Sequence, residues 1–542
     1  MATTQVTTTN GVHSETNGET RTQMTKFWKQ HSQNGDVTEM MLDTQAAEIS
    51  DIEIDEIIKY LPDYEGKDVL ELGAGIGRFT SILSKKVKSV VAVDFMDNFV
   101  KKNQEVNGHN KNVTFLCKNV LELEFEENSL DLIFSNWLLM YLGDNDIIIL
   151  IDKMLKWLKP TGRLFFRESC YQQSAIRLIS DLENHHATHF GMSTDDCCIL
   201  STDHYTLTGN KERSFNPTIY RSPNEYTNLV SSVTNKSKNG KAYGFDLVTS
   251  KSVETYIMMK NNHNQICWLM EPAERDSAEY HGYETFQKFL DQKQYSLNGI
   301  LRYEEIFGRD YISTGGHSTT QEFCGSLGLT KGQKVLDVGC GIGGSAFHMG
   351  REFGAEVIGI DLSSNMIGIA IERQREYQIP KVYFEVADAT KIQYPEDAFD
   401  VIYSRDTILH IKHKDQLFEN FYKWLKPGGK VLITDYVCGP HDKHSQEFKD
   451  YVAQRGYFLL TVDQYGQELQ NAGFTNVKAV DKTDMFVSIL QKELQVFDRK
   501  KGDFAKKFSV EDFDSIKTGW NDKLRRCGKG DQKWGFFYAE KA

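Results

Sequence analysis

Residues 335–343 read Val-Leu-Asp-Val-Gly-Cys-Gly-Ile-Gly, and residues 69–77 read Val-Leu-Glu-Leu-Gly-Ala-Gly-Ile-Gly. Each stretch is an apolar run, typical of a buried strand, that leads directly into a glycine-rich loop. The loops lie about half the chain apart, and Trp-Leu-Lys-Pro at 157–160 and 424–427 repeats with nearly the same spacing, which indicates an internal duplication. The chain is therefore predicted to hold two copies of one ligand-binding domain.

Short apolar runs alternate with helical patterns in both halves of the chain. In the second half we expect strands at 334–338, 356–360, 382–386, 399–404 and 430–435. This alternation predicts parallel βαβ units, and hence two tandem Rossmann-like α/β domains with doubly wound sheets. Ligands of such sheets bind at the carboxyl ends of the strands.

The domain boundaries follow from changes in composition. Residues 1–22 are rich in Thr, Asn and Gly, and we expect a disordered tail there. Domain 1 is placed at 23–267 and domain 2 at 291–542, with a polar linker at 268–290. The segment from 171 to 213 is long, polar and unpatterned, which is typical of a lid or of a disordered insertion.

Composition excludes several classes of protein. The 542-residue chain has a net charge of −13, which argues against a nucleic-acid partner. Its nine cysteines are an odd number without metal-ligand spacing, so we expect reduced thiols, a cytoplasmic location and no metal site. No signal peptide and no apolar run long enough for a membrane span is found in the sequence.

Acidic residues after two strands narrow the choice of ligand. Asp94 and Asp361 end the second strand of each copy, where a carboxylate can accept hydrogen bonds from both hydroxyls of a ribose. Asp388, matched by Asn119, follows the next strand and can accept from an adenine amino group. A glycine loop alone also fits a dinucleotide fingerprint, but Arg78 breaks that fingerprint in the first copy. The ordered set resembles the S-adenosylmethionine-dependent methyltransferases, which implies class I methyltransferase domains and S-adenosylmethionine as methyl donor.

Longer motifs in the second half define a narrower resemblance. In chain order they are Gln-Tyr at 294–295, Ile-Leu-Arg-Tyr-Glu at 300–304, Tyr-Ile-Ser-Thr-Gly-Gly at 311–316, Ser-Arg-Asp-Thr-Ile-Leu-His at 404–410, Tyr-Val-Ala-Gln-Arg-Gly-Tyr at 451–457 and Gly-Trp-Asn-Asp-Lys at 519–523. Together they resemble the phosphoethanolamine N-methyltransferases, the enzymes that build phosphocholine, in their two-domain plant-type form. The resemblance covers residues 27–542.

The resemblance implies a catalytic dyad of Tyr295 and His410. The substrate amine must lose a proton before its lone pair can attack the sulfonium methyl, and His410 is the natural base. An unperturbed histidine that takes a proton from an amine of pKa near 10 works about 5 kcal/mol uphill, which an enzyme can tolerate. Asp406, one helical turn earlier, is expected to face the ammonium group. Without the resemblance, a histidine that merely packs at a helix end is the simpler interpretation.

The resemblance also implies the other ligand contacts of domain 2. For the phosphate they are Tyr303, Tyr436, Tyr451, Arg455, Tyr457 and Lys523, phenols and cations that suit an anion. For the cofactor they are Ser313, Gly339, Asp361, Leu362, Asp388, Ala389 and Arg405. Spacing alone places only Tyr451 and Arg455 on one helix face, which would equally fit ordinary surface packing.

The first copy differs at the residues aligned with the dyad region. Trp137 stands where Asp406 stands, and Tyr141 where His410 stands. The resemblance implies cofactor contacts at Gly73, Arg78, Asp94, Asn119, Val120 and Asn136. It implies substrate contacts at Ser169, Ser174, Arg213 and Tyr220. Trp28 and His31 precede domain 1 much as Tyr295 precedes domain 2.

Two interpretations of the first copy compete. It is either a degenerate or regulatory cofactor-binding copy, or an active site that performs the first methylation while domain 2 adds the rest. Asn119 lacks the charge of the usual Asp, and the segment between Ser174 and Arg213 exceeds the family's loop by about 30 residues, a length that surface loops tolerate. We expect an active first domain. A glycine- or sarcosine-type N-methyltransferase is the enzymatic alternative, but a carboxylate substrate needs fewer phosphate ligands.

Overall fold

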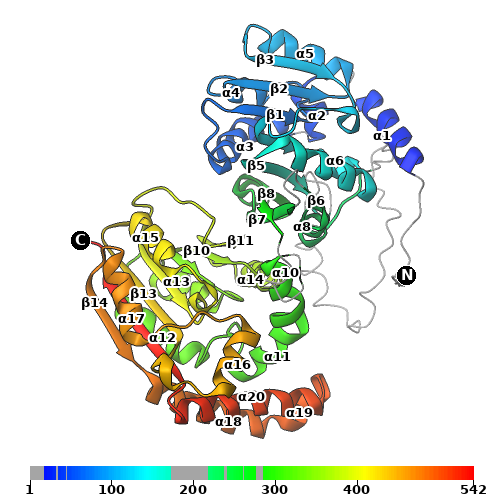
Figure 1. Cartoon of the computed structure of the whole chain (residues 1–542). Coiled ribbons are helices and arrows are strands. Elements are labelled where there is room, and N and C mark those ends of the chain that lie inside the picture. The colour runs from blue at the N-terminus through cyan, green and yellow to red at the C-terminus, as the bar shows by residue number, and fades with distance from the viewer. Residues whose placement is uncertain are drawn as a thin grey trace, which may run out of the picture. The chain divides into compact units, whose positions relative to one another are not determined.

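Figure 1 shows the computed structural model of the chain, which describes residues 17–31, 35–43, 45–171, 218–236, 241–260, 262–275, 283 and 285–542. The chain divides into two compact units, which we call domain 1 and domain 2. Domain 1 comprises Met1–Leu247 and Ser252–Arg275, and domain 2 comprises Val248–Lys251 and Asp276–Ala542.

Domain 1 is built on a sheet with the strand order β8-β5-β4-β1-β2-β3. Its parallel strands are β1 (Asp68–Leu72), β2 (Ser89–Asp94), β3 (Val113–Cys117), β4 (Leu130–Asn136) and β5 (Leu158–Ser169). The antiparallel strand β8 (Gln265–Glu274) pairs with β5, and β6 (Thr234–Lys236) pairs with β7 (Ala242–Ser252). The helices are α1 (Asn17–His31), α2 (Val37–Met41), α3 (Ala46–Tyr60), α4 (Thr80–Leu83), α5 (Asp97–Asn107), η1 (Val120–Glu122), η2 (Leu139–Tyr141), α6 (Asp144–Trp157), α8 (Pro223–Ser232) and α9 (Glu254–Lys260).

Domain 2 repeats this plan with the strand order β14-β15-β13-β12-β9-β10-β11. Its parallel strands are β9 (Lys334–Val338), β10 (Glu356–Asp361), β11 (Val382–Ala387), β12 (Phe399–Arg405) and β13 (Leu425–Cys438). Two antiparallel strands, β15 (Gln532–Glu540) and β14 (Thr475–Asp481), continue the sheet beyond β13. The chain turns from one side of the sheet to the other between β9 and β12, which is where ligands of such sheets bind.

The helices of domain 2 fall into those that follow strands and those that precede or close the domain. The first group is α13 (Gly344–Phe353), α14 (Ser364–Tyr377), η5 (Ile408–His410), α15 (Lys414–Trp424), η6 (His441–Lys443), α16 (Gln446–Arg455), α17 (Val462–Asn471), α18 (Thr483–Arg499), α19 (Lys501–Lys507) and α20 (Val510–Gly528). The lead-in group is α10 (Phe286–Phe289), the π-helical turn η4 (Leu290–Gln294), α11 (Leu297–Phe307) and α12 (Gly316–Leu327).

The sheet of domain 2 is held by a continuous apolar core. Leu336, Ile402 and Val431 from adjacent strands are fully buried and pack with Trp424 of α15 and Phe537 of β15. Truncation of a fully buried leucine or isoleucine to alanine costs about 2–5 kcal/mol. This core fixes the register in which the strands end, and hence the positions of the residues that follow them.

Glycine is required where each first strand enters its loop. Gly73 and Gly339 have φ angles of 69° and 73°, in the region that L residues rarely adopt. A Cβ at Gly339 would also overlap the side chain of Thr407. The predicted α/β fold with two tandem domains is confirmed, and the glycine loops have the conformation that the repeated motif indicates.

Two of the predicted boundaries are wrong. The linker predicted at 268–290 begins inside β8, because residues 268–274 continue that strand and Met270 pairs with Leu164 of β5. The tail predicted at 1–22 overlaps α1, which begins at Asn17, and the residues before Asn17 lie outside the described residues. The predicted lid or insertion at 171–213 lies, beyond Tyr171, outside the described residues. None of the helices in the described parts of the chain has both the length and the apolar character that a membrane crossing requires.

Candidate active site

Each domain holds an aspartate between its glycine loop and the turn after β2 or β10. In domain 2, Gly341 N donates to Asp361 Oδ2 over 3.0 Å and Ser363 N donates to Oδ1 over 2.9 Å. In domain 1, Gly75 N donates to Asp94 Oδ2 over 2.9 Å and Met96 N to Oδ1 over 2.8 Å. Burial raises the pKa of both carboxyl groups to about 6, so both remain largely ionised at neutral pH. The same rigid acceptor is therefore built twice.

A cavity of about 480 Å³ opens at the carboxyl ends of β9, β10 and β12 in domain 2. All seven residues predicted to contact the cofactor line it: Ser313, Gly339, Asp361, Leu362, Asp388, Ala389 and Arg405. Tyr295, Asp406 and His410 line the same cavity. The structure thus brings the predicted cofactor and catalytic residues together, and their contacts with a ligand stay a prediction.

Some of these side chains are already engaged by the protein. Arg405 donates to Thr320 Oγ1, Thr319 Oγ1 and Thr314 O at 2.6–2.8 Å, so its guanidinium holds the start of α12 against the sheet. Asp388 Oδ1 accepts from Thr390 N over 2.9 Å. Asn119 Oδ1 accepts in the same manner from Leu121 N over 3.0 Å. Asn119 therefore reproduces the turn that Asp388 forms, although it lacks the charge.

His410 sits at the end of η5 in contact with two residues of the lead-in segment. Its Nε2 lies 3.3 Å from Tyr295 Oη and 3.3 Å from Gln294 Nε2. Since the amide of Gln294 can only donate there, Nε2 carries a lone pair and is an acceptor. The other ring nitrogen, Nδ1, is buried without a hydrogen bond from the protein.

The charge state of His410 differs from the expectation of an unperturbed base. Burial, followed by the positive charges of Arg455 and Lys414, lowers the pKa of His410 to about 3. The imidazole is therefore neutral at physiological pH and able to accept a proton, but it is a weaker base in the free protein than an exposed histidine. The proton-transfer cost that follows from an ordinary histidine pKa is therefore wrong for the free protein.

Asp406 is positioned by a residue far along the chain. Trp534 Nε1, from β15, donates to Asp406 Oδ1 over 2.8 Å, and Thr314 N donates to Oδ2 over 3.4 Å. Burial raises the pKa of Asp406, while Arg405 and these donors oppose the shift. The backbone of Asp406 has a φ of 50°, which turns the chain out of β12 and places the carboxylate in the cavity wall.

The residues predicted to bind phosphate form one aromatic and basic cluster. The ring of Tyr457 lies 5.0 Å from that of His410 and 5.8 Å from that of Tyr451. On the next turn of α16, Arg455 lies 6.0 Å from the Tyr451 ring, so these two residues do share a helix face. Burial alone lowers the pKa of Arg455, but Tyr457, Tyr303 and the other neighbouring phenols hold it above its usual value.

Lys523 completes the cluster from α20. Its Nζ lies 3.8 Å above the ring of Trp520 and 5.9 Å from that of Tyr436. Burial lowers the pKa of Lys523 to about 8, and the buried carboxylate of Glu493 opposes that shift. The ring of Tyr303 lies 6.0 Å from that of Trp520. Two cations ringed by phenols form a site suited to a phosphate group.

Domain 1 carries different chemistry at the corresponding place. Trp137 has a φ of 54° and its N donates to Arg167 O, as Asp406 has a φ of 50° and its N donates to Thr434 O, so the two residues stand at the same place after the strand. In domain 1 the tryptophan at this place is itself fixed by a hydrogen bond, because Trp137 Nε1 donates to Gln265 Oε1 over 2.9 Å. Gln265 Nε2 then donates to Ser169 Oγ over 2.6 Å. The predicted substrate residue Ser169 is thus buried and tied to the tryptophan.

The pair that corresponds to Tyr295 and His410 is aromatic. The ring of Trp28 lies 5.3 Å from that of Tyr141 in an edge-on arrangement. Burial raises the pKa of Tyr141 well above its usual value, and Tyr220 adds to the shift, so both phenols belong to one neighbourhood. The structure describes no side chain for His31.

The remaining residues predicted for domain 1 are only partly placed at a ligand site. Gly73 lies in the loop and Val120 is buried in η1. Asn136 Oδ1 accepts from Arg167 Nη1 over 3.2 Å. Arg78 is bound to helix α3, since its Nε donates to Ser50 Oγ over 2.9 Å. Ser174 and Arg213 lie outside the described residues.

Several residues around the site were not predicted from the sequence. Asp337 in β9 lines the cavity, its Oδ2 is buried without a partner, and burial raises its pKa to about 7. Gln294, which contacts both members of the dyad, stands next to Tyr295 in the quoted motif, and that adjacency could have revealed it. Trp534 and Glu493 lie far away in the sequence and give no local signal.

These features fit S-adenosylmethionine. The carboxylate of Asp361 can accept hydrogen bonds from ribose hydroxyls, and that of Asp388 from an adenine amino group. Asp337 Oδ2, which has no hydrogen-bond partner among the described residues, can accept from a further donor of the ligand. A parallel sheet whose glycine loop and second-strand acid meet at the switch point defines a class I S-adenosylmethionine-dependent methyltransferase domain, and this chain has two. Family models described as "Methyltransferase domain" match residues 70–166 and 318–479.

Known proteins narrow this class. The chain is 48% identical to phosphoethanolamine N-methyltransferase 1 of Zea mays over 517 residues, which cover 95% of each chain. It is 47% identical to phosphoethanolamine N-methyltransferase 3 of Arabidopsis thaliana, over 97% of this chain and 99% of that one. The structure of Haemonchus contortus phosphoethanolamine N-methyltransferase 2, in complex with phosphomonomethylethanolamine and S-adenosylhomocysteine, matches with a TM-score of 0.66 at 27% identity, over 91% of this chain and 98% of that one. The chain belongs to the phosphoethanolamine N-methyltransferase family, which confirms the resemblance of its motifs.

Proposed function

We propose that the two domains divide the stepwise methylation of phosphoethanolamine to phosphocholine. Domain 1 adds the first methyl group and domain 2 adds the later ones. One observation carries the proposal. The backbone N–H groups that hold Asp94 and Asp361 are alike in the two domains, whereas Trp137 occupies the place of Asp406. Equal cofactor sites beside unequal substrate sites suit successive steps on a substrate whose amine changes at each step.

In domain 2 the phosphobase lies with its phosphate among the tyrosines, Arg455 and Lys523, and with its amine at Asp406 and His410. Bound S-adenosylmethionine supplies the electrophilic methyl group. The carboxylate of Asp406 attracts the amine electrostatically, and this attraction persists when methylation has removed the N–H donors. A site with a fixed carboxylate therefore suits the more methylated substrates.

His410 accepts a proton from the amine. Between an imidazole of pKa about 3 and an amine of pKa near 10, the transfer costs about 10 kcal/mol. Substrate binding reduces this gap in two ways. The phosphate pairs with Arg455, whose charge contributes to the low pKa of His410, and burial of the ammonium lowers its own pKa.

Domain 1 offers an aromatic setting in place of the carboxylate. The ring of Trp137 is stacked against the guanidinium of Arg167, 3.7 Å away, and is fixed by Gln265. Ser169 occupies the register position on β5, opposite Gln265, that Tyr436 occupies on β13, opposite Trp534. A primary amine has three N–H donors after protonation and can be oriented by such polar oxygens without a carboxylate.

The test uses the full chain with the carboxylate of either Asp94 or Asp361 removed. Asp94→Ala and Asp361→Ala each remove a carboxylate that two backbone N–H groups hold in place and that is expected to accept the two ribose hydroxyls. Loss of two hydrogen bonds between the cofactor and a charged group costs about 3 kcal/mol or more, at least a hundredfold in cofactor affinity. Each variant is assayed on phosphoethanolamine and on its monomethyl and dimethyl derivatives by product chromatography.

The proposal expects opposite patterns in the two variants. Asp94→Ala should lose turnover of phosphoethanolamine and keep turnover of the methylated substrates, while Asp361→Ala should stop at the monomethyl product. Each variant is the control for the folding of the other. Wild-type turnover of phosphoethanolamine by Asp94→Ala would contradict the assignment and favour a regulatory first domain.

We further propose that the enzyme works in the cytoplasm. The support is that all cysteines in the described parts of the chain are free thiols, as expected in a reducing compartment. A fluorescent fusion that enters the secretory route would contradict this location.

A further inference from the structure

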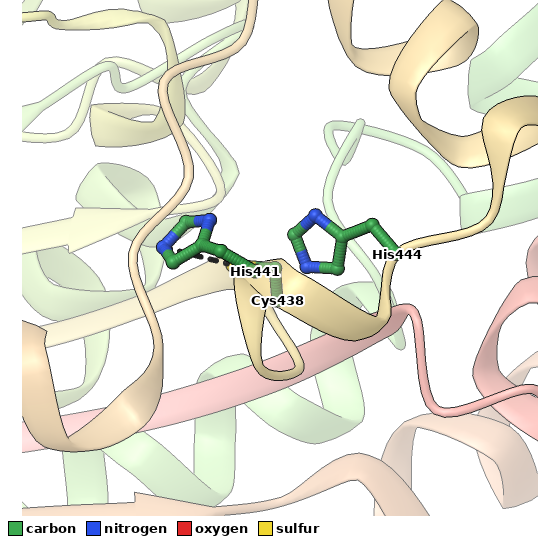
Figure 2. A group of neighbouring side chains, drawn as sticks. All are labelled: Cys438, His441 and His444. Carbon is green, nitrogen blue, oxygen red and sulfur yellow. Dashed lines mark hydrogen bonds between the residues drawn. The ribbon is translucent and has the colours of Figure 1, made fainter.

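Three side chains with metal-binding atoms meet at the end of β13, apart from the methyl-transfer residues. They are Cys438, His441 and His444, and Figure 2 shows them gathered around the short turn that follows the strand. One ligand atom from each lies within 4.8 Å of the others. Their sequence pattern is one cysteine and two histidines, each three residues apart, which a search for paired cysteines does not detect.

We propose that Cys438, His441 and His444 form a binding site for a single zinc-class transition-metal ion. A thiolate and two imidazoles are the donors that Zn²⁺ and Co²⁺ prefer, whereas Mg²⁺ and Ca²⁺ require oxygen donors. The site is independent of the proposed division of methylation between the domains.

The distances allow tetrahedral coordination after a small closure. Cys438 Sγ lies 4.0 Å from His441 Nε2, and a tetrahedral zinc ion would hold this sulfur and nitrogen about 3.6 Å apart. Gln464 Oε1 lies 3.2 Å from the same nitrogen, close to the separation of about 3.4 Å for nitrogen and oxygen ligands of one zinc ion. Gln464 Oε1 thus stands beside one proposed ligand, while it also accepts from Thr461 N over 3.0 Å.

The surroundings of the cluster favour a metal ligand over a free side chain. The Nε2 of His444 lies 3.0 Å from the carbonyl of Gly439, and a hydrogen bond there leaves Nδ1 with the lone pair that a metal ion needs. Cys438 is only 1% exposed, so its sulfur is shielded from solvent on the sides that face the protein. His441 is exposed, which gives an ion access from solvent.

The segment that carries the ligands is fixed at both ends, so binding orders few residues. Gly439 N donates to Asp531 O over 3.0 Å, and Ser445 Oγ donates to Asp531 Oδ2 over 2.6 Å. Ser445 also caps α16, the helix that carries Tyr451 and Arg455. The ring of His444 packs against Phe448 of this helix at 5.0 Å. A bound ion would therefore tie the end of β13 to the helix of the phosphate cluster.

The test is a titration of the full-length chain with Co²⁺ followed by visible spectroscopy. We expect one Co²⁺ per chain, intense bands of a tetrahedral site and a charge-transfer band from the thiolate, all removed by an equivalent of Zn²⁺. Cys438→Ser should abolish the charge-transfer band. His441→Ala, which changes an exposed ring and leaves the buried packing intact, should weaken binding at least tenfold.

Cys117→Ser is the matched control, since Cys117 is an exposed cysteine in the described part of domain 1 and its substitution should leave the titration unchanged. Binding of S-adenosylhomocysteine by each variant checks that the fold is intact. Zinc should raise the melting temperature of the wild type and not that of His441→Ala. Absence of saturable Co²⁺ binding would overturn the proposal. Binding of Co²⁺ by Cys438→Ser and by His441→Ala as tight as that of the wild type would also overturn it, and would show adventitious binding only.

Discussion

Substitution of Trp534 by phenylalanine tests the role of Asp406 without touching the carboxylate. The change removes the indole N–H that donates to Asp406 Oδ1 over 2.8 Å. A hydrogen bond to a charged group contributes about 1.5–3 kcal/mol, so the pKa of Asp406 should rise further once this donor is lost. The direction follows because the lost donor favours the ionised form, while burial already favours the neutral one.

The expected result depends on the methylation state of the substrate. With less carboxylate charge at neutral pH, kcat/KM for the dimethyl substrate should fall about 10- to 100-fold, the same free energy expressed as a rate. The acidic limb of its pH profile should move toward higher pH. Turnover of phosphoethanolamine by domain 1 should not change.

The control must remove a buried indole donor without removing one from a carboxylate. Trp268→Phe meets this requirement, since Trp268 Nε1 donates over 3.0 Å to the neutral hydroxyl of Thr227 in domain 1. Both variants lose packing and should melt earlier. If Trp534→Phe kept kcat/KM for the dimethyl substrate within twofold of Trp268→Phe, the indole would not control the charge of Asp406, and the reasoning would be refuted.

Two further predictions concern stability. Gly339→Ala should destabilise domain 2 by about 2 kcal/mol or more, because φ is 73° and the new Cβ overlaps Thr407. Gly428→Ala, where φ is 75° and the new Cβ meets no neighbour, should cost only the backbone strain of about 1–2 kcal/mol. Urea unfolding compares the two variants, and equal losses of stability would contradict the packing argument. His410 has its pKa lowered to about 3, so below pH 6.5 the unfolded chain binds the proton first and stability falls as the pH drops toward 3. Removal of this group in His410→Gln should recover about 3 kcal/mol of the loss at pH 4.5. Unfolding at pH 7 and at pH 4.5 measures this recovery, and a pH dependence equal to that of the wild type would show that burial does not lower the pKa of His410.

The sequence predicted those parts of the site that depend on local order along a strand. Asp361 ends β10 and the glycine loop follows β9, and because neighbouring parallel strands end at one edge, their proximity follows from the sequence. Arg78 shows the limit of this reasoning, because its neighbours in sequence place it in the loop while its side chain is bound to Ser50 of α3.

Long-range partners were beyond such reasoning. The bond from Trp534 to Asp406 and the bond from Trp137 to Gln265 each span 128 residues, and both depend on an antiparallel strand that returns to the sheet after several helices. The strand β8 was itself taken for a linker beyond residue 267, because a short polar run with Pro272 is typical of a linker unless its pairing partner is known. Without that strand, Gln265 has no predicted neighbour.

These two long bonds explain how one duplicated fold came to hold two different sites. In each domain the antiparallel strand next to β5 or β13 provides the group that fixes the residue after β4 or β12. In domain 2 the strand β15 provides the indole donor of Trp534, and the residue that it fixes is the carboxylate of Asp406. In domain 1 the strand β8 provides the amide acceptor of Gln265, and the residue that it fixes is the indole of Trp137. A change at either position alone would leave a buried carboxylate or a buried N–H unsatisfied, which costs about 1–3 kcal/mol or more. The two positions must therefore change together, and under the proposed division of methylation this pair is what would set the substrate preference of each domain.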